Sequence, residues 1–549
     1  MQPVSVGEIV PGPQPGAALI AALLDPGAYP HPARRVRRIE THISWVLLAG
    51  RYAYKIKKPV DYGFLDYSTV ERRRHFCEEE VRLNRRLCPG VYRGVAPIVV
   101  GPDGVRVGGV GTPCEYAVVM RRLPAHRMLD RLVRGGRVTQ QMIERVARRI
   151  AEFHATAATG PEIEVFGSLQ TIRFNWRENF EQSRPFVGRT ISTAELQDIE
   201  DFVERFLDDH APLFRDRVAL GRIRDCHGDL RAASICVTDG LCIFDCIEFN
   251  DRIRYSDVAS EVAFLAMDLD ALGRPDLGYW FADCYSALSG DVGLRRVLPF
   301  YACYRAFIRG KLHSLRLDQL AGRDGAVEGE MRLARHYLHL AWSYARAPRE
   351  PVLVVVGGLP GVGKTSLARA LAARLGGAAY SSDLVRKALA GLPPAIRPAG
   401  AFEAGLYAPE ITRRVYGRLA ELARDTLRNG MTVVLDATFR CADDRRLAYQ
   451  AAQDVGVPCW LVECVCPDEV VRVRLERRRA RGEGASDADW GVYVKQRAAF
   501  EAIGDEPPAR HLIVETTPDL PVALEAALGP ILRAPAPPAL AALPSNAVA

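Results

Sequence analysis

The segment GLPGVGKT, residues 358–365, combines glycines, a lysine and a threonine at the spacing that binds nucleotide phosphates. An apolar strand-like run precedes it, and an amphipathic helical pattern follows it. The glycines let backbone N–H groups approach phosphates at the positive end of that helix, Lys364 reaches the β and γ oxygens, and Thr365 binds Mg²⁺. The sequence therefore predicts a site for magnesium ATP that consists of Gly358, Leu359, Pro360, Gly361, Val362, Gly363, Lys364, Thr365 and Ser366.

Three further polar residues follow the same pattern of strands and helices. The strand-like run TVVLDATF ends in Asp436, where a carboxylate at the tip of a parallel strand holds the magnesium shell or positions a substrate. In SSDLVRKAL, Asp383 and Arg386 lie one helical turn apart, so both can face one ligand. Helix capping would also explain Asp436 and Asp383, and the residues alone leave both interpretations open.

A second group of carboxylates lies in CHGDLRAASICVTDGLCIFDCIEFN, residues 226–250. Asp-Gly between two apolar runs predicts a β-hairpin, which returns the chain to its starting point. Asp229 before the hairpin and Asp245 after it can then flank one site. In that site Asp229 would accept a hydroxyl proton and Asp245 would hold Mg²⁺.

Length and composition restrict the class of protein. A chain of 549 residues with 48% hydrophobic and 25% charged residues predicts two or three globular domains. The net charge of +7 is modest and arginines alternate with acidic residues, so we expect no nucleic-acid partner. The sequence has no run of 18 apolar residues and no secretory signal, which predicts a cytoplasmic protein without a membrane partner.

The cysteines follow no regular framework. Thirteen are present without a CxxC pair, which in a reducing compartment argues against disulfides and for small buried side chains. The spacing of four of them fits no common zinc pattern, so we expect core packing rather than a metal site at Cys226, Cys236, Cys242 and Cys246.

The order of predicted elements divides the chain. Strand-like runs and one charged helix come first, helical patterns dominate from about residue 140, and alternating strands and helices begin after the polar segment ARAPREP. The expected parts are an N-terminal extension (1–34), a first domain (35–344) with a small lobe to about residue 124, a linker (345–351), a second domain (352–533) and a disordered Pro/Ala tail (534–549).

Residues 351 to about 530 resemble the small P-loop kinases that phosphorylate hydroxyl groups, such as gluconate kinase, chloramphenicol phosphotransferase, zeta toxins and the 5′-kinase domain of polynucleotide kinase. The resemblance implies an α/β domain with a mostly parallel sheet, with Asp383 as the base and Arg386 as a phosphate clamp. The segment VVRVRLERRRARGEGASDADW resembles their arginine-bearing lid, which implies Arg474 and Arg478 as residues that neutralise charge on the transferred group. A solvated helix face is the alternative for most of these arginines.

Residues from about 35 to 340 resemble the aminoglycoside phosphotransferase family, a relative of protein kinases, which implies an α+β bilobal domain. Lys55 in YAYKIKK would bind the α and β phosphates, and Glu80 in EEEVRLNRRL would be its helix partner. Lys57 points to the same face of the strand and stays open as an alternative. Met120 in EYAVVMRRL would lie at the adenine, unless this stretch is simply a core strand.

The chain departs from that family at three points. No glycine-rich loop precedes the lysine, and a shorter turn near Thr41, His42 and Ser44 would cover the phosphates. The family has Asn five residues after the catalytic Asp to hold magnesium, and this chain has Ser234, a weaker and shorter ligand. Arg231 stands where relatives that join such a domain to a P-loop kinase domain tend to have His. The resemblance therefore implies a site that is slow, altered in metal use or reduced to a binding module.

Together the two sites predict an ATP-dependent phosphotransferase that moves the γ-phosphoryl group of ATP to a hydroxyl group of a small-molecule acceptor, with ATP and Mg²⁺ as cofactors. The fusion resembles a recurring bacterial arrangement of a bifunctional phosphotransferase with an AAA-type ATP-binding domain. One alternative is an active P-loop kinase with a non-catalytic kinase-like module, and another is a P-loop ATPase switch coupled to a partner. The sequence identifies neither acceptor nor oligomeric state.

Overall fold

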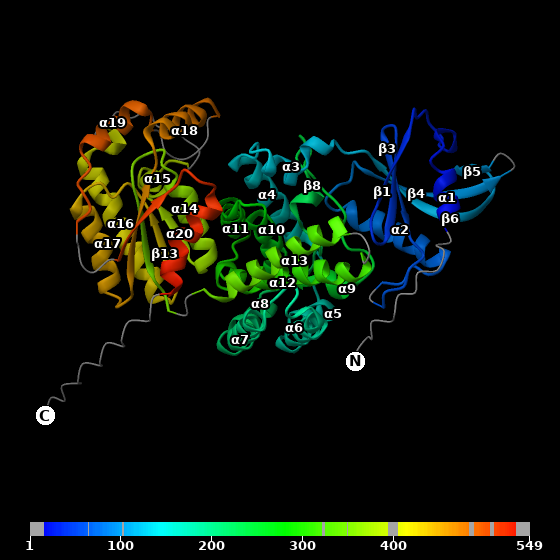
Figure 1. Cartoon of the computed structure of the whole chain (residues 1–549), viewed down its shortest axis with the longest axis horizontal. Helices are drawn as coiled ribbons and strands as arrows, with labels where there is room; N and C mark the ends of the chain where they lie inside the picture. Colours follow the sequence, from blue (N-terminus) through cyan, green and yellow to red (C-terminus); the bar gives the residue numbers. More distant parts are fainter. Residues whose placement is uncertain are drawn as a thin grey trace. The chain divides into compact units, whose positions relative to one another are not determined.

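The computed structural model describes residues 16–63, 65–101, 104–320, 324–347, 350–393, 405–481, 488–504 and 510–533. The chain forms two compact units (Figure 1). The first unit comprises Met1–Val138, Arg148–Ile172 and Pro212–Leu265, and the second comprises Thr139–Ala147, Arg173–Ala211 and Ala266–Ala549. The predicted tail (534–549) and the first fifteen residues of the predicted extension lie outside the described residues.

The first unit contains a six-stranded antiparallel sheet in the order β1-β2-β3-β6-β4-β5. Apolar side chains alternate along β2, where Trp45, Leu47 and Ala49 are buried against residues of α1 and η1. Helix α2 covers the other face and begins after Thr69, whose hydroxyl accepts from Arg72 N at 3.2 Å. The elements are α1 (Ala17–Ala22), η1 (Pro26–Ala28), β1 (Val36–Glu40), β2 (Ser44–Ala49), β3 (Tyr52–Lys57), α2 (Val70–Asn84), β4 (Tyr92–Gly101), β5 (Gly104–Val107) and β6 (Thr112–Arg121).

Short strands and helices complete the first unit. The predicted hairpin is confirmed: β8 (Ile235–Cys236) pairs antiparallel with β9 (Cys242–Ile243). A second short pair joins β7 (Ile223–Asp225) to β10 (Tyr255–Asp257). The helices are α3 (Leu129–Arg134), α5 (Pro161–Glu164) and α9 (Asp251–Arg254), while α4 (Gln140–Thr156), α6 (Leu169–Ser183), α8 (Ala211–Ala219) and α10 (Val258–Ala271) have residues in both units.

Cys88 and Cys242 form a disulfide, so the prediction that the chain has none is wrong. One cysteine follows α2 and the other lies in β9, with 154 residues between them and their Cα atoms 4.8 Å apart. No spacing pattern pairs residues that only the tertiary fold brings together. Cys226, Cys236 and Cys246 are free and buried, as expected.

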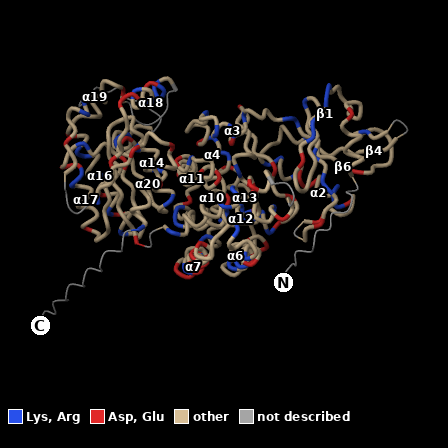
Figure 2. Tube along the Cα trace, viewed as in Figure 1, with Lys and Arg blue, Asp and Glu red and all other residues tan. Residues whose placement is uncertain are grey.

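The second unit begins with long helices that pack through aromatic side chains. The Trp176 ring stacks on Phe180 and meets Phe300 and Phe307 edge-on or tilted. Charged residues lie along α6 and α7, and acidic ones predominate on α7 (Figure 2). The helices are α7 (Thr193–Asp209), α11 (Pro275–Ser289), α12 (Leu294–Gln319) and α13 (Asp324–Ala345). Within the described part of the chain, no helix has the length and apolar character needed to cross a membrane.

The second unit also contains a five-stranded sheet in the order β12-β13-β11-β14-β15, and every pair in it is parallel. This confirms the predicted parallel sheet. The central strand β11 is buried along its whole length, as its apolar sequence predicts. The elements are β11 (Leu353–Gly357), α14 (Lys364–Leu375), β12 (Ala378–Ser381), α15 (Ser382–Leu389), η6 (Gly405–Tyr407), α16 (Pro409–Arg428), β13 (Val433–Asp436), α17 (Ala442–Gln453), β14 (Cys459–Val465), α18 (Asp468–Arg481), α19 (Trp490–Ala498), β15 (Arg510–Glu515) and α20 (Leu520–Arg533).

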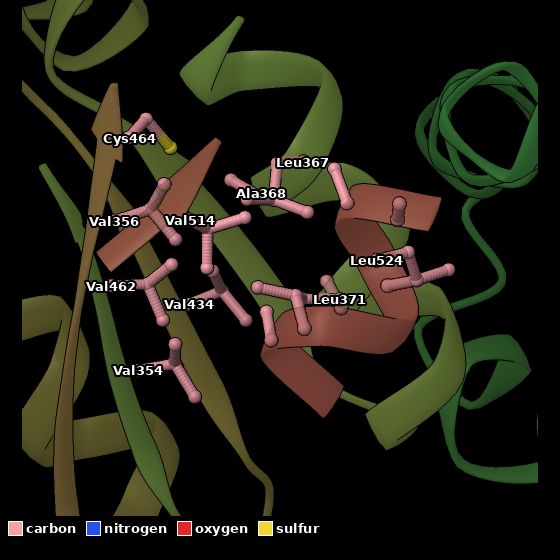
Figure 3. Close-up of a cluster of buried hydrophobic side chains, with 14 of the residues drawn as sticks. Val354, Val356, Leu367, Ala368, Leu371, Val434, Val462, Cys464, Val514 and Leu524 are labelled. Atoms are coloured by element: carbon pink, nitrogen blue, oxygen red, sulfur yellow. The ribbon is translucent and has the colours of Figure 1, made fainter. Parts of the chain in front are cut away.

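Two apolar layers hold this sheet. On one face, α14 and α20 contribute Leu367, Leu371 and Leu524, which pack against valines of β11, β13, β14 and β15 (Figure 3). On the other face, α16 and α17 pack against the alternate side chains of the same strands. Helix α14 is therefore held rigidly below the sheet, with its N-terminus at the carboxyl end of β11.

Candidate active sites

The loop from β11 to α14 has backbone angles that require glycine. Gly358 has φ 134°, and a Cβ there would lie 2.6 Å from Cys464 O. Gly363, the residue before α14, has φ 102°. Only glycine combines these angles with so close an approach of the neighbouring backbone. The loop therefore has the form in which backbone N–H groups at a helix N-terminus receive phosphates.

Lys364 and Thr365 begin α14 and lie at the predicted phosphate site. Lys364 Nζ donates to Leu359 O at 2.8 Å, so the ammonium curls over the loop. Burial lowers the pKa of Lys364, while Asp436 opposes this effect. Thr365 Oγ1 donates to Asp436 Oδ2 at 2.7 Å. The predicted hydroxyl and carboxylate ligands of magnesium are thus brought together from the start of α14 and the end of β13.

Asp383 and Arg386 lie on α15, next to this pair. Ser381 at the end of β12 pairs with Asp436 at the end of β13. Asp383 comes two residues after Ser381 in the sequence, so it lies near the Asp436 carboxylate. Burial raises the pKa of Asp383, and the charge of Asp436 raises it further. The buried Arg386 donates to Leu406 O at 2.8 Å and lies over the Tyr407 ring. Its guanidinium is therefore held by the segment that precedes α16.

The two candidate lid arginines have different surroundings. Arg474 on α18 donates to Thr516 O at 2.6 Å and to Val362 O at 3.2 Å. It therefore joins the phosphate loop to the end of β15. Arg478, one turn further along α18, donates to Ala488 O at 2.7 Å, and residues 482–487 of the predicted lid lie outside the described part of the chain.

The residues of this site fit both magnesium and a triphosphate. Magnesium prefers hard oxygen ligands, and the Thr365 hydroxyl and the Asp436 carboxylate are 2.7 Å apart. The glycine loop leaves no room for side chains against the surrounding protein, because a Cβ would lie 2.6 Å from Cys464 O at Gly358 and 2.9 Å from Val471 Cγ1 at Gly361. We therefore assign Thr365 and Asp436 as the residues able to hold the ion, with Lys364 and the loop backbone around the phosphates.

In the first unit, Lys55 forms the centre of the second candidate site. Lys55 Nζ donates to Glu80 Oε1 on α2 at 2.9 Å and to Asp245 Oδ1 at 2.7 Å. Burial acts to lower the pKa of Lys55, but Asp245 and Glu80 outweigh it and the pKa is raised. The same ammonium lowers the pKa of Asp245 to about 2. The group is thus fully ionised at neutral pH.

Lys57, the alternative that the sequence left open, lies in a different environment. Its side chain is 0% exposed and donates to Glu80 Oε2 at 2.8 Å, to Glu248 and to the Tyr67 hydroxyl. Lys55 retains 12% exposure and contacts the exposed carboxylate of Asp245. Lys57 therefore serves a closed ion-pair network, whereas Lys55 faces the side from which a ligand can approach.

The backbone displays Asp245 in an unusual conformation. Its φ is 66°, in the left-handed region that residues other than glycine seldom adopt. Two side chains from the small lobe hold this turn, because Asp245 N donates to Tyr92 Oη at 3.3 Å and Cys246 N donates to Asn84 Oδ1 at 2.9 Å. Its side chain is 52% exposed. The fold thus constrains the Asp245 backbone while leaving its carboxylate accessible.

The loop that contains His227, Gly228 and Asp229 is anchored by Glu261 on α10. The backbone N–H groups of His227 and Gly228 both donate to Glu261, which also pairs with His154 at 2.9 Å. Burial acts to raise the pKa of Glu261, but these hydrogen bonds outweigh it and lower the pKa to about 2. Cys226 offers a third possible metal ligand nearby. Because both Glu261 oxygens already accept hydrogen bonds, we assign this group to structure.

His227 joins the two candidate carboxylates. Its Nε2 lies 3.0 Å from Phe244 O, so Nε2–H donates there, and its Nδ1 accepts from Asp229 N at 3.3 Å. Burial lowers the pKa of His227 and keeps the ring neutral, as this pattern of one donor and one acceptor requires. The imidazole therefore sets the spacing between the backbone of Asp229 and the residue that precedes Asp245.

Asp229 itself is paired with Arg231. Arg231 Nε donates to Asp229 Oδ1 at 2.8 Å and Nη2 donates to Oδ2 at 2.7 Å. The Ser234 hydroxyl lies 2.8 Å from Arg231 O and accepts from Arg231 N at 3.1 Å. Asp245 thus fits one magnesium ion as an exposed oxygen ligand, whereas Ser234 does not, since its hydroxyl is already engaged with the loop backbone.

Met120 lies on the nucleotide side of the small-lobe sheet. It pairs with Ala53, two residues along from the pair formed by Lys55 and Val118, so all four side chains share one face. Phe244, which precedes Asp245, packs in the same cluster. The short turn before β2 is closed by Thr41 Oγ1, which lies 3.0 Å from Ser44 O. Met120, Val118 and Phe244 thus belong to one apolar cluster on the face of the sheet that carries Lys55.

No motif in the sequence identified Glu261 or Glu248 as site residues. Glu261 is a single acidic residue in the apolar stretch VASEVAFLAM. A buried charge in an apolar helix needs a partner, and that signal could have marked Glu261 as an anchor. Glu248 had no comparable signal, because its partners Lys57 and Tyr67 are more than 180 residues away.

Comparisons with known proteins match the two parts of the chain that contain these candidate sites. The family profile described as "Phosphotransferase enzyme family" matches residues 71–300, and the one described as "AAA domain" matches residues 353–503. Uncharacterized proteins of Mycobacterium tuberculosis H37Rv and Mycobacterium bovis are each 35% identical over 454 residues, which cover 82% of this chain and 87% of theirs.

Two solved structures are similar to different parts of the chain. A gluconokinase from Sinorhizobium meliloti 1021 is 19% identical with a TM-score of 0.25, covering 34% of this chain and 94% of its own. A candidate aminoglycoside phosphotransferase from Ralstonia eutropha JMP134 is 12% identical with a TM-score of 0.33, covering 57% and 92%. The chain belongs to the same family as the mycobacterial proteins, and it joins a kinase-like domain of the phosphotransferase enzyme family to a P-loop kinase domain.

Proposed function

We propose that the P-loop site transfers the γ-phosphoryl group of ATP to a hydroxyl group of a small-molecule acceptor. One observation carries this proposal: Thr365 Oγ1 and Asp436 Oδ2 lie 2.7 Å apart at the mouth of the glycine loop, with Asp383 in the first turn of α15 after the neighbouring strand β12. A site for ATP alone would need only the first two residues. The additional carboxylate, with its raised pKa, supplies a proton acceptor.

The transfer needs no reactant besides ATP and the hydroxyl acceptor. Asp383 accepts the hydroxyl proton while the hydroxyl oxygen bonds to the γ-phosphorus, and the bond from that phosphorus to the β–γ bridging oxygen breaks to release ADP. Lys364 holds the β and γ oxygens, and Arg474 keeps the phosphate loop joined to β15. Magnesium held by Thr365 and Asp436 would supply neutralising charge on those oxygens.

For the kinase-like domain we propose a second nucleotide site, in which Lys55 contacts the phosphates, Glu80 orients Lys55 and Met120 lies at the adenine. In this site Asp245 would hold magnesium and Asp229 would be the proton acceptor. The pairing of Asp229 with Arg231 favours a second candidate function for this domain, that of a nucleotide-binding module without transfer. A carboxylate with both oxygens engaged by a guanidinium cannot accept a proton until that pair opens.

The full chain tests both proposals. We expect ATP-dependent labelling of at least one member of a metabolite library rich in hydroxyl groups, with labelling lost in Lys364→Ala and in Asp383→Asn. Lys495→Ala, an exposed lysine on α19 of the same domain, should match the wild type. Recovery of the γ-phosphate only as free phosphate across the whole library would favour the ATPase switch instead.

The contribution of the kinase-like site follows from the same assay. Two-site transfer predicts that Lys55→Met or Asp229→Ala removes labelling of one acceptor while the product of the P-loop site persists. A binding module predicts that neither variant removes any product.

A further inference from the structure

Kinases of this type hold two magnesium ions with an aspartate and an asparagine. In this chain Ser234 stands at the asparagine position, and its contacts differ from those of a metal ligand. A second magnesium ion needs a further oxygen ligand opposite Asp245, and by position that ligand would come from Ser234. The Ser234 side chain is 4% exposed and points into its own loop, where its oxygen lies 2.8 Å from Arg231 O and 3.2 Å from Asp229 O. It also accepts from Arg231 N. The hydrogen and one lone pair of the hydroxyl are thus engaged within the loop, and the other lone pair is buried with the side chain.

A guanidinium fills the space beside Asp229 instead. Both Asp229 oxygens accept from Arg231, at 2.8 and 2.7 Å, in the fork geometry that gives the strongest carboxylate pairs. The positive charge of Arg231 also acts on Asp245, whose pKa it helps to lower after Lys55 and His227. One cation therefore acts on both carboxylates that flank the site.

We propose that the guanidinium of Arg231 takes the place of the second magnesium ion, so that the kinase-like site binds its nucleotide with a single divalent cation held by Asp245. This inference rests on the proposed nucleotide binding at that site. A divalent ion close to Arg231 would be repelled, and it would have to displace both hydrogen bonds of a partly buried pair. Asp245 keeps an exposed carboxylate and a backbone conformation fixed by Tyr92 and Asn84, so it retains the capacity for one ion.

The replacement has a chemical consequence at the site. An arginine remains charged at every relevant pH and needs no metal in solution. Of the two cations beside Asp229 and Asp245, the guanidinium would therefore be permanent and only the magnesium ion would depend on the solution. The site would respond to magnesium with a simple hyperbolic dependence, since only one ion binds. A family member with two ions would show a steeper dependence, because two binding events contribute.

The test counts metal ions on the full-length Lys364→Ala protein, in which the P-loop site is disabled. The non-hydrolysable analogue AMP-PNP is added to saturation, and bound Mn²⁺ is counted by electron paramagnetic resonance together with bound nucleotide. We expect one Mn²⁺ per bound nucleotide, and its affinity should fall at least tenfold in Asp245→Asn. Two Mn²⁺ per bound nucleotide would overturn the inference while leaving the proposed nucleotide site intact. Absence of bound nucleotide would overturn both.

A pair of further variants tests the residues themselves. Arg231→His with Ser234→Asn restores the family pattern, and we expect the ratio to rise from one Mn²⁺ to two. Ser234→Asn alone leaves the guanidinium in place and should remain at one. If the double variant does not fold by circular dichroism, Arg231→Gln removes the charge with little change in size, and we expect it to bind Mn²⁺ more tightly than the parent protein. Unchanged Mn²⁺ binding in every folded variant would contradict the role given to Arg231.

Discussion

The two candidate sites of this chain are built by different means. In the P-loop site, eight consecutive residues form a backbone cradle between one strand and one helix. In the kinase-like site, Lys55 meets Asp245 across 190 residues of sequence, and side chains from four segments make the site. One site depends on backbone angles, and the other depends on a network of charges.

This difference determines how each site responds to change. A backbone cradle keeps its form when a side chain is shortened, because glycine conformations and the sheet beneath it set the geometry. A buried ion-pair network loses more when one member is removed, because the remaining charge is left in a medium of low polarity. We therefore expect substitutions to affect mainly activity in the P-loop site and mainly stability in the kinase-like site.

The largest effect is expected for Lys57→Met. The variant leaves Glu80 and Glu248 buried with one cation fewer, which should cost about 3 to 5 kcal/mol of unfolding free energy in the first unit. Urea denaturation of the full chain, followed by tryptophan fluorescence, which includes that of the buried Trp45 in the first unit, measures this loss. Lys58→Met is the matched control, because Lys58 pairs with Glu40, whose side chain is 43% exposed, and such pairs contribute less than about 1 kcal/mol. Equal losses in both variants would contradict the distinction between the two lysines.

Lys364→Ala should show the opposite balance in the P-loop site. The ammonium donates to the loop carbonyl of Leu359, and burial disfavours its charge more than Asp436 favours it, so stability should change little. Turnover should fall by roughly 100- to 1000-fold, as for other groups that neutralise transition-state charge. Steady-state kinetics and thermal unfolding on the same samples check both halves. A loss of folding that accompanies the loss of turnover would break the comparison between the two sites.

Much of the fold could be predicted because its signals are local. The apolar run of β11 followed by the glycine loop, the Asp-Gly turn of the hairpin at residues 238–240 and the alternation along β2 each lie within a few residues. The structure confirms the parallel sheet of the second unit and the strand-like runs at the start of the first. Periodicity describes which side chains face a core, and that was enough to identify these elements.

What the sequence could not predict depends on contacts between distant segments. The Cys88–Cys242 disulfide, the pairing of Glu248 with Lys57 and the anchoring of His227 by Glu261 join residues whose spacing carries no pattern. Arg474 illustrates the same limit at the P-loop site. Its type suggested a role in the lid, but only the fold shows that it donates to the backbone of Val362 and Thr516.

Glu261→Gln tests how the kinase-like loop is anchored. Glutamine has one carbonyl oxygen in place of two carboxylate oxygens, so one of the bonds from His227 N, Gly228 N and His154 is lost, at about 2 kcal/mol. The folded-state pKa of Glu261, about 2, lies below its unfolded value of 4.5. Its stabilising contribution is therefore present above pH 4.5 and is lost as the pH falls toward 2. Equal destabilisation at pH 6 and pH 8 in urea titrations agrees with this sign, and a loss confined to pH 8 contradicts it.

The smallest effect, and one of opposite sign, is expected in the P-loop unit from Asp444 on α17. Burial raises the pKa of Asp444 to about 6, so its contribution to stability is present below its ordinary pKa of 3.8 and is lost as the pH rises through 6. Asp444→Asn removes this titration and should stabilise the unit at pH 8 by about 1 kcal/mol, allowing for partial exposure. At pH 4.5 the gain should be smaller, because the native carboxyl is already neutral there and only ionisation in the unfolded state still opposes folding. Asp443→Asn, on the exposed neighbour, should show no such pH dependence, and a gain for Asp444→Asn that is equal at both pH values would mean that the charge of Asp444 is not what destabilises the unit.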